Sequence, residues 1–153
     1  MAIKGVYRIN VDELAATIDE CLKELANRAD GAIEEAASFS AQKGAQTLKA
    51  TSPKLASNTY NRTNRKGTKK RKPGKYAKGW RVKAEGGGAG HLYIIHNATD
   101  YQLTHLLEKG HALRQGGRSR AIVHIKPVEQ DAIKDFEKLL RQFIESGEMS
   151  FTL

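Results

Sequence analysis

The chain has 153 residues, a net charge of +9 and a single cysteine, Cys21. This length fits one domain with enough apolar surface to fold unaided, and a lone cysteine excludes an intrachain disulfide. No apolar stretch approaches the ~20 residues that cross a bilayer, and the N-terminus lacks the apolar core of a signal peptide. We therefore expect one soluble domain, residues 1–153, made in a reducing cytoplasm and without membrane contact.

The positive charge is concentrated in one segment. Between Lys54 and Lys83 the chain has twelve lysines and arginines and no acidic residue, whereas the remainder has fourteen basic and seventeen acidic residues. The domain is therefore mildly acidic apart from one strongly basic insertion.

A long helix is predicted over residues 11–49. Asn10 is a good N-cap, and Glu13 stands three residues later, where a capping-box partner belongs. Apolar residues then recur every three or four positions and share one stripe: Val11, Leu14, Ile18, Leu22, Leu25, Ala29, Ala32, Ile33 and Ala36. Cys21 lies among them, so we expect a small buried side chain and not a reactive thiol.

The predicted length of this helix raises a question of shape. At 1.5 Å per residue it would be ~58 Å long, more than the diameter of a domain of this size. The helix therefore either projects from the domain or breaks, and Gly31 and Gly44 are its weakest positions. A projecting helix with an apolar stripe needs a partner, which favours an oligomer.

A basic, mobile loop is expected over residues 51–79, because this segment has no periodicity and is rich in polar residues, glycine and proline. Eight of its basic residues are candidates for contact with DNA or with a partner: Arg62, Arg65, Lys66, Lys69, Lys70, Arg71, Lys72 and Lys75. Such a run can bind nucleic acid without sequence preference by neutralising phosphates. The alternatives are an acidic surface on a neighbouring subunit, or solvent alone.

A sheet and further helices are expected in residues 80–147. Apolar and polar residues alternate from Trp80 to Glu85, which predicts a half-buried strand, and Leu92–His96 is its expected return strand. The glycines at positions 86–90 form a flexible turn between them.

Two helices complete the prediction. A short helix from Tyr101 to Lys109, capped by Thr99 or Asp100, should end at a left-handed Gly110. After a loop and a short strand over residues 121–125, Pro127 opens an amphipathic helix, which Gly147 ends. Its apolar face consists of Val128, Ala132, Ile133, Phe136, Leu139, Leu140, Phe143 and Ile144. Helices and strands are segregated, so we predict an α+β fold with a small antiparallel sheet on which the last helix packs.

Signals of catalysis or of a cofactor are weak. His105, Glu108 and His111 are close in sequence, but no HExxH or paired CxxC spacing accompanies them, so we expect no metal. Only two acidic residues lie between positions 86 and 128, too few for a metal-dependent nuclease. The glycines at 86–90 lead into a strand and not into a helix, unlike a phosphate-binding loop. We predict a protein without catalytic residues and without cofactors.

The segment from Tyr101 to Pro127 contains a series of short motifs. A tyrosine is followed by a leucine-rich turn that ends in Leu-Glu-x-Gly-His, by a glycine-rich basic loop and by His-Ile-x-Pro at the start of the last helix. The motif residues are Tyr101, Leu107, Glu108, Gly110, His111, Gly116, Gly117, His124, Ile125 and Pro127. This pattern resembles the HK97-type family of siphophage tail-component, or tail-completion, proteins. Ser52-Pro53 and the later Tyr76–Trp80 stretch resemble the family's sequence before its first strand.

The resemblance implies a non-enzymatic structural virion protein of a tailed phage or prophage. Such a protein acts at the head–tail junction or at the end of the tail tube, and related tail-terminating proteins form rings, commonly hexamers, around the DNA channel. The implied partners are further copies, other neck or tail proteins, and packaged DNA. The family has a shorter interval before its Gly-Trp, so the resemblance assigns no role to the basic run. A non-specific nucleic-acid-binding protein is the alternative that the basic run supports.

The motif residues also have an architectural reading. Gly110 can end the short helix, Glu108 can pair with His111 or Arg114, and Pro127 suits the first turn of the last helix. None of these tasks requires catalysis, so we expect the motif to organise the fold.

Overall fold

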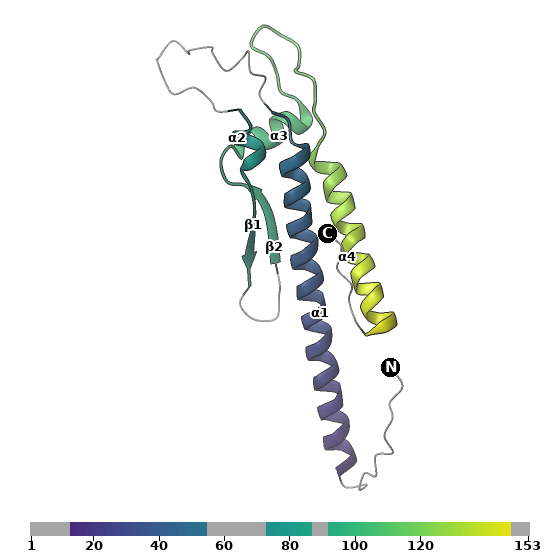
Figure 1. Ribbon diagram of the computed structural model, residues 1–153. Coiled ribbons are helices and arrows are strands. Elements are labelled where there is room, and N and C mark those ends of the chain that lie inside the picture. The colour runs from purple at the N-terminus through teal and green to yellow at the C-terminus, as the bar shows by residue number, and fades with distance from the viewer. Residues whose placement is uncertain (1–12, 55–72, 87–91, 148–153) are drawn as a thin grey trace.

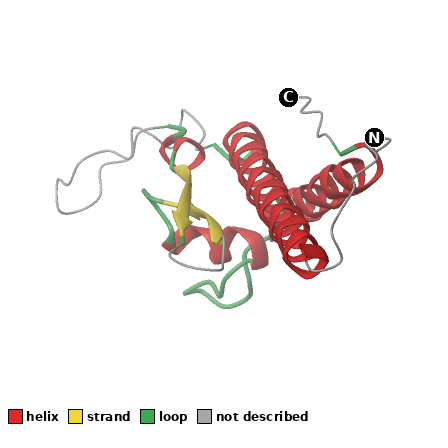
Figure 2. Cartoon of the chain, turned by 90° about the horizontal axis from the view of Figure 1, so that it is seen from below, coloured by secondary structure: helices red, strands yellow, loops and turns green. Residues whose placement is uncertain are grey.

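The computed structural model describes residues 13–54, 73–86 and 92–147. The expected Asn10 cap, most of the glycine turn and the basic residues from Arg62 to Lys72 lie outside these ranges. The described residues form four helices and one two-stranded antiparallel sheet, which confirms the α+β class (Figure 1). Seen along its length, the longest helix lies between the sheet on one side and the last helix on the other (Figure 2).

Helix α1, Leu14–Thr51, is the central element and has 38 residues. It continues without a break through Gly31 and Gly44, so it projects from the body, with a length of ~57 Å. Its N-terminal part extends past the end of α4 (Figure 1). We call residues 13–30 the arm.

Small residues on the second half of α1 let the last helix and the sheet approach it closely. Its buried positions are Ala32, Ala36, Ser40, Ala41, Gly44, Ala45 and Leu48. Helix α4, Ile125–Ser146, packs along this half, and Lys43 forms an ion pair of 2.9 Å with Asp135 across the contact. The expectation that the last helix packs on the sheet is therefore wrong, because α4 makes its main contacts with α1.

The sheet is the predicted hairpin. Strands β1, Trp80–Glu85, and β2, Leu92–Asn97, pair with Trp80 opposite Asn97 and Glu85 opposite Leu92. A two-stranded sheet is marginal alone, and here α1 supports both strands.

Three local predictions need correction. The short helix α2, Lys75–Lys78, lies inside the expected loop. Helix α3, Gln102–Lys109, has Tyr101 at its N-cap and no side-chain cap, so neither Thr99 nor Asp100 caps it. Residues 121–124 are not a strand: the N–H of Ile122 donates to the carbonyl oxygen of Leu107 at 2.7 Å, and α4 begins at Ile125.

The core lies at the end of α1 that is farther from the arm. Leu48, Tyr76, Trp80 and Val128 form its buried centre, and the partly buried side chains around them are Ile95, Leu103, Leu107 and Ile125. Helices α1, α2 and α4 and strand β1 each contribute one residue to the centre, and β2, α3 and α4 contribute the side chains around it. No helix in the described ranges is long and apolar enough to cross a membrane.

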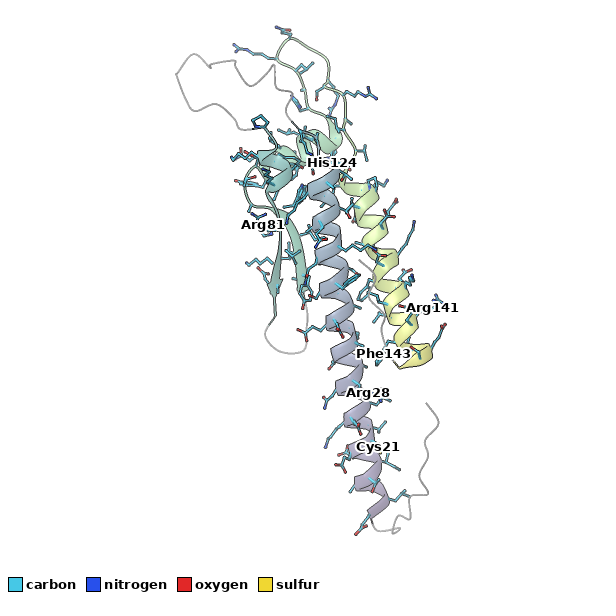
Figure 3. All side chains as sticks on the ribbon, viewed as in Figure 1. Cys21, Arg28, Arg81, His124, Arg141 and Phe143 are labelled. Atoms are coloured by element: carbon cyan, nitrogen blue, oxygen red, sulfur yellow. The ribbon has the colours of Figure 1, made fainter. Side chains whose placement is uncertain are left out.

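The arm differs from the predicted helix in one respect. Cys21 is exposed, so the expectation of a buried cysteine is wrong (Figure 3). The predicted stripe is present, and among the residues that the structure describes α4 covers only its second half.

Candidate functional site

The two halves of the Tyr101–Pro127 motif meet at the start of α4. Pro127 is the third residue of this helix and has no N–H, so His124, Ile125 and Lys126 carry the N–H groups that the first turn leaves without helical partners. The carboxylate of Glu108, at the end of α3, accepts hydrogen bonds from all three, at 2.9, 3.0 and 3.0 Å. Glu108 therefore caps α4 from a different helix.

The capping role replaces the expected pairing of Glu108 with His111 or Arg114. A carboxylate is well suited to this position because the N-terminus of a helix carries a partial positive charge. Burial raises the pKa of Glu108, but the three backbone hydrogen bonds and the nearby His124 outweigh that effect, so the pKa lies below its ordinary value. Glu108 is thus ionised at neutral pH.

His124 joins this cap to the core. Its Nδ1 lies 2.7 Å from the carbonyl oxygen of Ile122 and 3.2 Å from the carboxylate of Glu108. Both are acceptors, so Nδ1 carries a hydrogen, and Nε2 lies 2.8 Å from the hydroxyl of Tyr76, which donates to it when Nε2 carries no hydrogen. Burial raises the pKa of Tyr76 to about 12, with the charge of Glu108 adding to the effect, so the phenol remains a donor.

The earlier part of the motif enters the same core. Trp80 packs edge-on against Tyr76, with ring centroids 5.7 Å apart, and its indole N–H donates to the hydroxyl of Ser52 at 2.7 Å. Ser52 and Trp80 are both buried. This bond joins the residue that follows α1 to the first residue of β1. It therefore ties together the two ends of the chain segment between α1 and β1.

Asn97 holds α2 against the end of the hairpin. Its side-chain amide donates to the carbonyl oxygen of Tyr76 at 2.8 Å, and its Oδ1 accepts from the N–H groups of Thr99 and Asp100. A Cβ at Gly79 would collide with this Oδ1 and with the hydroxyl of Thr99. Only glycine therefore fits at position 79.

The loop of residues 110–120 is closed at its base by His111 and Ser119. The hydroxyl of Ser119 accepts from the N–H of His111 at 2.9 Å and lies 2.9 Å from its Nδ1, and the N–H of Ser119 donates to the carbonyl oxygen of His111. Gly110 has a φ of 68° with an extended ψ of 164°, so it is not the left-handed helical cap that we expected. A Cβ there would also collide with the carbonyl oxygen of Ser119.

The surface around these buried groups is basic. We call α2, α3, the loop to residue 124 and the first turn of α4 the basic end, and all of them gather at one end of the molecule (Figure 1). Residues 73–79 and 98–127 include seven basic and two acidic side chains. Both acids are engaged, Glu108 in the cap and Asp100 in an ion pair of 3.1 Å with Lys75. Lys75, a candidate for DNA contact, thus has an acidic partner in its own chain.

Several residues of this site were not predicted from the sequence. Asn97 was not singled out, although an Asn before Ala-Thr-Asp at the end of a strand is typical of a side chain that binds the backbone of the next turn. The structure also describes basic side chains at this end, Arg114, Arg118 and Arg120 among them. They were not predicted as candidates for contact, because the run in residues 62–75 is denser.

The buried groups of this site are hydrogen-bonded to one another, an arrangement that orders the chain where α1, α3 and α4 meet. His124 illustrates this, since it lies inside the junction of α1, α3 and α4 (Figure 3). Comparisons of the chain with protein-family models, with curated proteins and with solved structures found no match.

Proposed function

We propose that the chain is a non-catalytic structural subunit of a phage or prophage virion, a tail-completion component that assembles at the head–tail junction, in a ring or on ring partners. The observation that carries the proposal is the Glu108 cap. It joins Leu-Glu-x-Gly-His directly to His-Ile-x-Pro, so the motif that resembles the tail-completion family acts as one structural unit.

The distribution of apolar side chains supports an assembling subunit. In the described ranges ten apolar residues are buried, whereas thirteen large ones are exposed. An imbalance of this kind is unusual for a protein that works alone and is expected where neighbours cover part of the surface. The arm carries four of the exposed residues, namely Leu14, Ile18, Leu22 and Leu25.

A deletion experiment in the phage or prophage that encodes the chain tests this function. Without the gene, induced cells should accumulate DNA-filled heads and separate tails, and the wild-type gene supplied in trans should restore joined particles. A Glu108→Ala gene should restore fewer particles than a Glu145→Ala gene, because Glu145 is an exposed residue of the same helix that Glu108 caps. Fully joined, infectious particles without the gene would refute the proposal.

The second candidate is non-specific binding to nucleic acid, and the basic end is the observation that favours it. If it holds, affinity for duplex DNA should fall steeply as salt rises, because each neutralised phosphate releases counterions. Absent binding at low salt, or binding that salt does not change, would eliminate this candidate.

A further inference from the structure

The arm carries an apolar stripe that no described part of the chain covers. Its residues are Leu14, Ile18, Leu22 and Leu25, with exposed fractions of 45, 50, 59 and 60%. Three small, uncharged residues, Ala15, Cys21 and Ala26, border this stripe on the helix surface, with Asp19 beyond them on one side and Arg28 on the other. The stripe is therefore a narrow apolar edge that can enter a space between two walls.

The body has a groove of matching character. It lies between β2 and α4, has α1 as its floor and a volume of about 750 Å³. Leu92 and Ile95 line one wall, and Ile133 and Phe136 line the other. In the floor, the buried hydroxyl of Ser40 has no hydrogen-bond partner within the described ranges.

We propose that the arm of one copy occupies this groove on a second copy. The arm cannot enter the groove of its own chain, because α1 is one continuous helix and its second half forms the floor. The lengths agree: the stripe from Leu14 to Leu25 and the floor from Ala37 to Leu48 both span ~17 Å of helix.

The area of contact favours the groove over a pair of arms. A stable and specific interface buries roughly 800 Å² on each partner. Two arms side by side would cover only their narrow stripes, whereas a helix in the groove contacts a floor and two walls.

Charge favours the same contact. The arm has five acidic and two basic residues, whereas the groove begins beside the basic end, where the exposed Lys49 and Lys126 follow the lining residues Leu48 and Ile125. Two glutamates, Glu129 and Glu137, also line the groove. The acidic residues of the arm lie further round the helix than the stripe and its small neighbours, so they need not face these glutamates.

The contact has a consequence for assembly. Each copy would give its arm to one neighbour and receive the arm of another, which is a heterologous contact that closes into a ring or continues as a filament. The inference rests on one part of the proposed function, namely that copies of the chain associate. It adds which two surfaces meet, the arm and the groove.

Cross-linking through the single native thiol tests the contact in the full-length protein. In an Ile133→Cys variant, mild oxidation should yield species larger than a dimer, joined between Cys21 of one copy and the new thiol of another, as identified by peptide mass spectrometry. Lys138→Cys is the matched control: it places the thiol on an exposed position of α4 outside the groove, and the corresponding bond to Cys21 should not form.

A charge placed in the stripe completes the test. Leu22→Glu in the Ile133→Cys background should lower the yield of cross-linked species about tenfold or more, because a carboxylate would face an apolar wall. Asn27→Glu adds the same charge to the arm away from the stripe and should leave the yield unchanged. Disulfides found only between two Cys21 residues, or no bond between Cys21 and position 133 at any protein concentration, would overturn the inference. Either outcome would leave the virion function testable through gene deletion.

Discussion

The basic end and the arm of this protein both belong to a fold built around α1, but they differ in how their side chains are accommodated. At the basic end and in the core next to it, Glu108, His124, Tyr76 and Trp80 are paired with one another, with Ser52 or with the backbone. Along the arm, Leu14 to Leu25 face outward on the continuation of the stripe that α4 covers farther along α1. The first region is therefore held together by internal contacts, whereas no described residue covers the apolar stripe of the second. The following changes test this contrast.

Replacement of leucine by alanine at two positions of α1 should give the largest contrast in the free energy of unfolding. Leu48→Ala empties a site in the core and should lower the free energy of unfolding by about 2–5 kcal/mol. Leu22→Ala removes an exposed side chain and should change it by no more than about 0.5 kcal/mol at concentrations where the protein is monomeric. Urea denaturation of both variants measures the two effects. Equal losses would show that the arm is already packed within one chain.

Alkaline conditions should weaken the basic end through Tyr76. Its pKa is about 12 in the folded state and 10.0 ordinarily, so its contribution is complete below pH 10 and is lost as pH rises toward 12. The loss corresponds to about 1.4 kcal/mol for each unit of difference. A Tyr76→Phe variant should lack this part of the pH dependence of unfolding. An unchanged alkaline slope in that variant would assign the loss to other groups.

Removal of the charge on Glu108 should have a moderate effect. Glu108→Gln retains one acceptor oxygen but loses the charged cap of three N–H groups, so stability should fall by about 1–2 kcal/mol. Glu129→Gln, an exposed position near the start of α4, is the control and should be nearly neutral. Thermal unfolding of the two variants at pH 7 compares them directly.

Acidic pH should remove part of the stability that the ionised Glu108 provides, a smaller effect than that of the Glu108→Gln substitution. Because the folded-state pKa of Glu108 is lower than 4.5, its contribution is present above that value and disappears as pH falls through the lowered pKa. The difference in stability between wild type and Glu108→Gln should therefore shrink below pH 4.5. A difference that stays constant down to acid unfolding would mean that the charge is not what stabilises the cap.

Periodicity was sufficient for the elements that depend on local pattern. The apolar spacing along α1, the alternation in Trp80–Glu85 and the stripe of α4 all predicted the elements that form. The short apolar run before Ile125 was mistaken for a strand, because so few residues do not distinguish a strand from the entry to a helix.

Contacts between distant segments were beyond what the sequence reveals. The partners of Glu108 stand sixteen to eighteen residues away, and no local rule pairs a carboxylate with the N-terminus of another helix. The exposure of Cys21 was missed for a related reason: a stripe records that apolar residues need cover, but not whether the cover belongs to the same chain.

A cryo-electron microscopy reconstruction of the head–tail junction of purified particles would show whether the protein is a ring-forming subunit there. We expect density for several copies of this fold in a ring, with the Glu108 cap intact and each arm covered by a neighbour. A complete reconstruction of the neck and tail in which every subunit is accounted for by other proteins would contradict it.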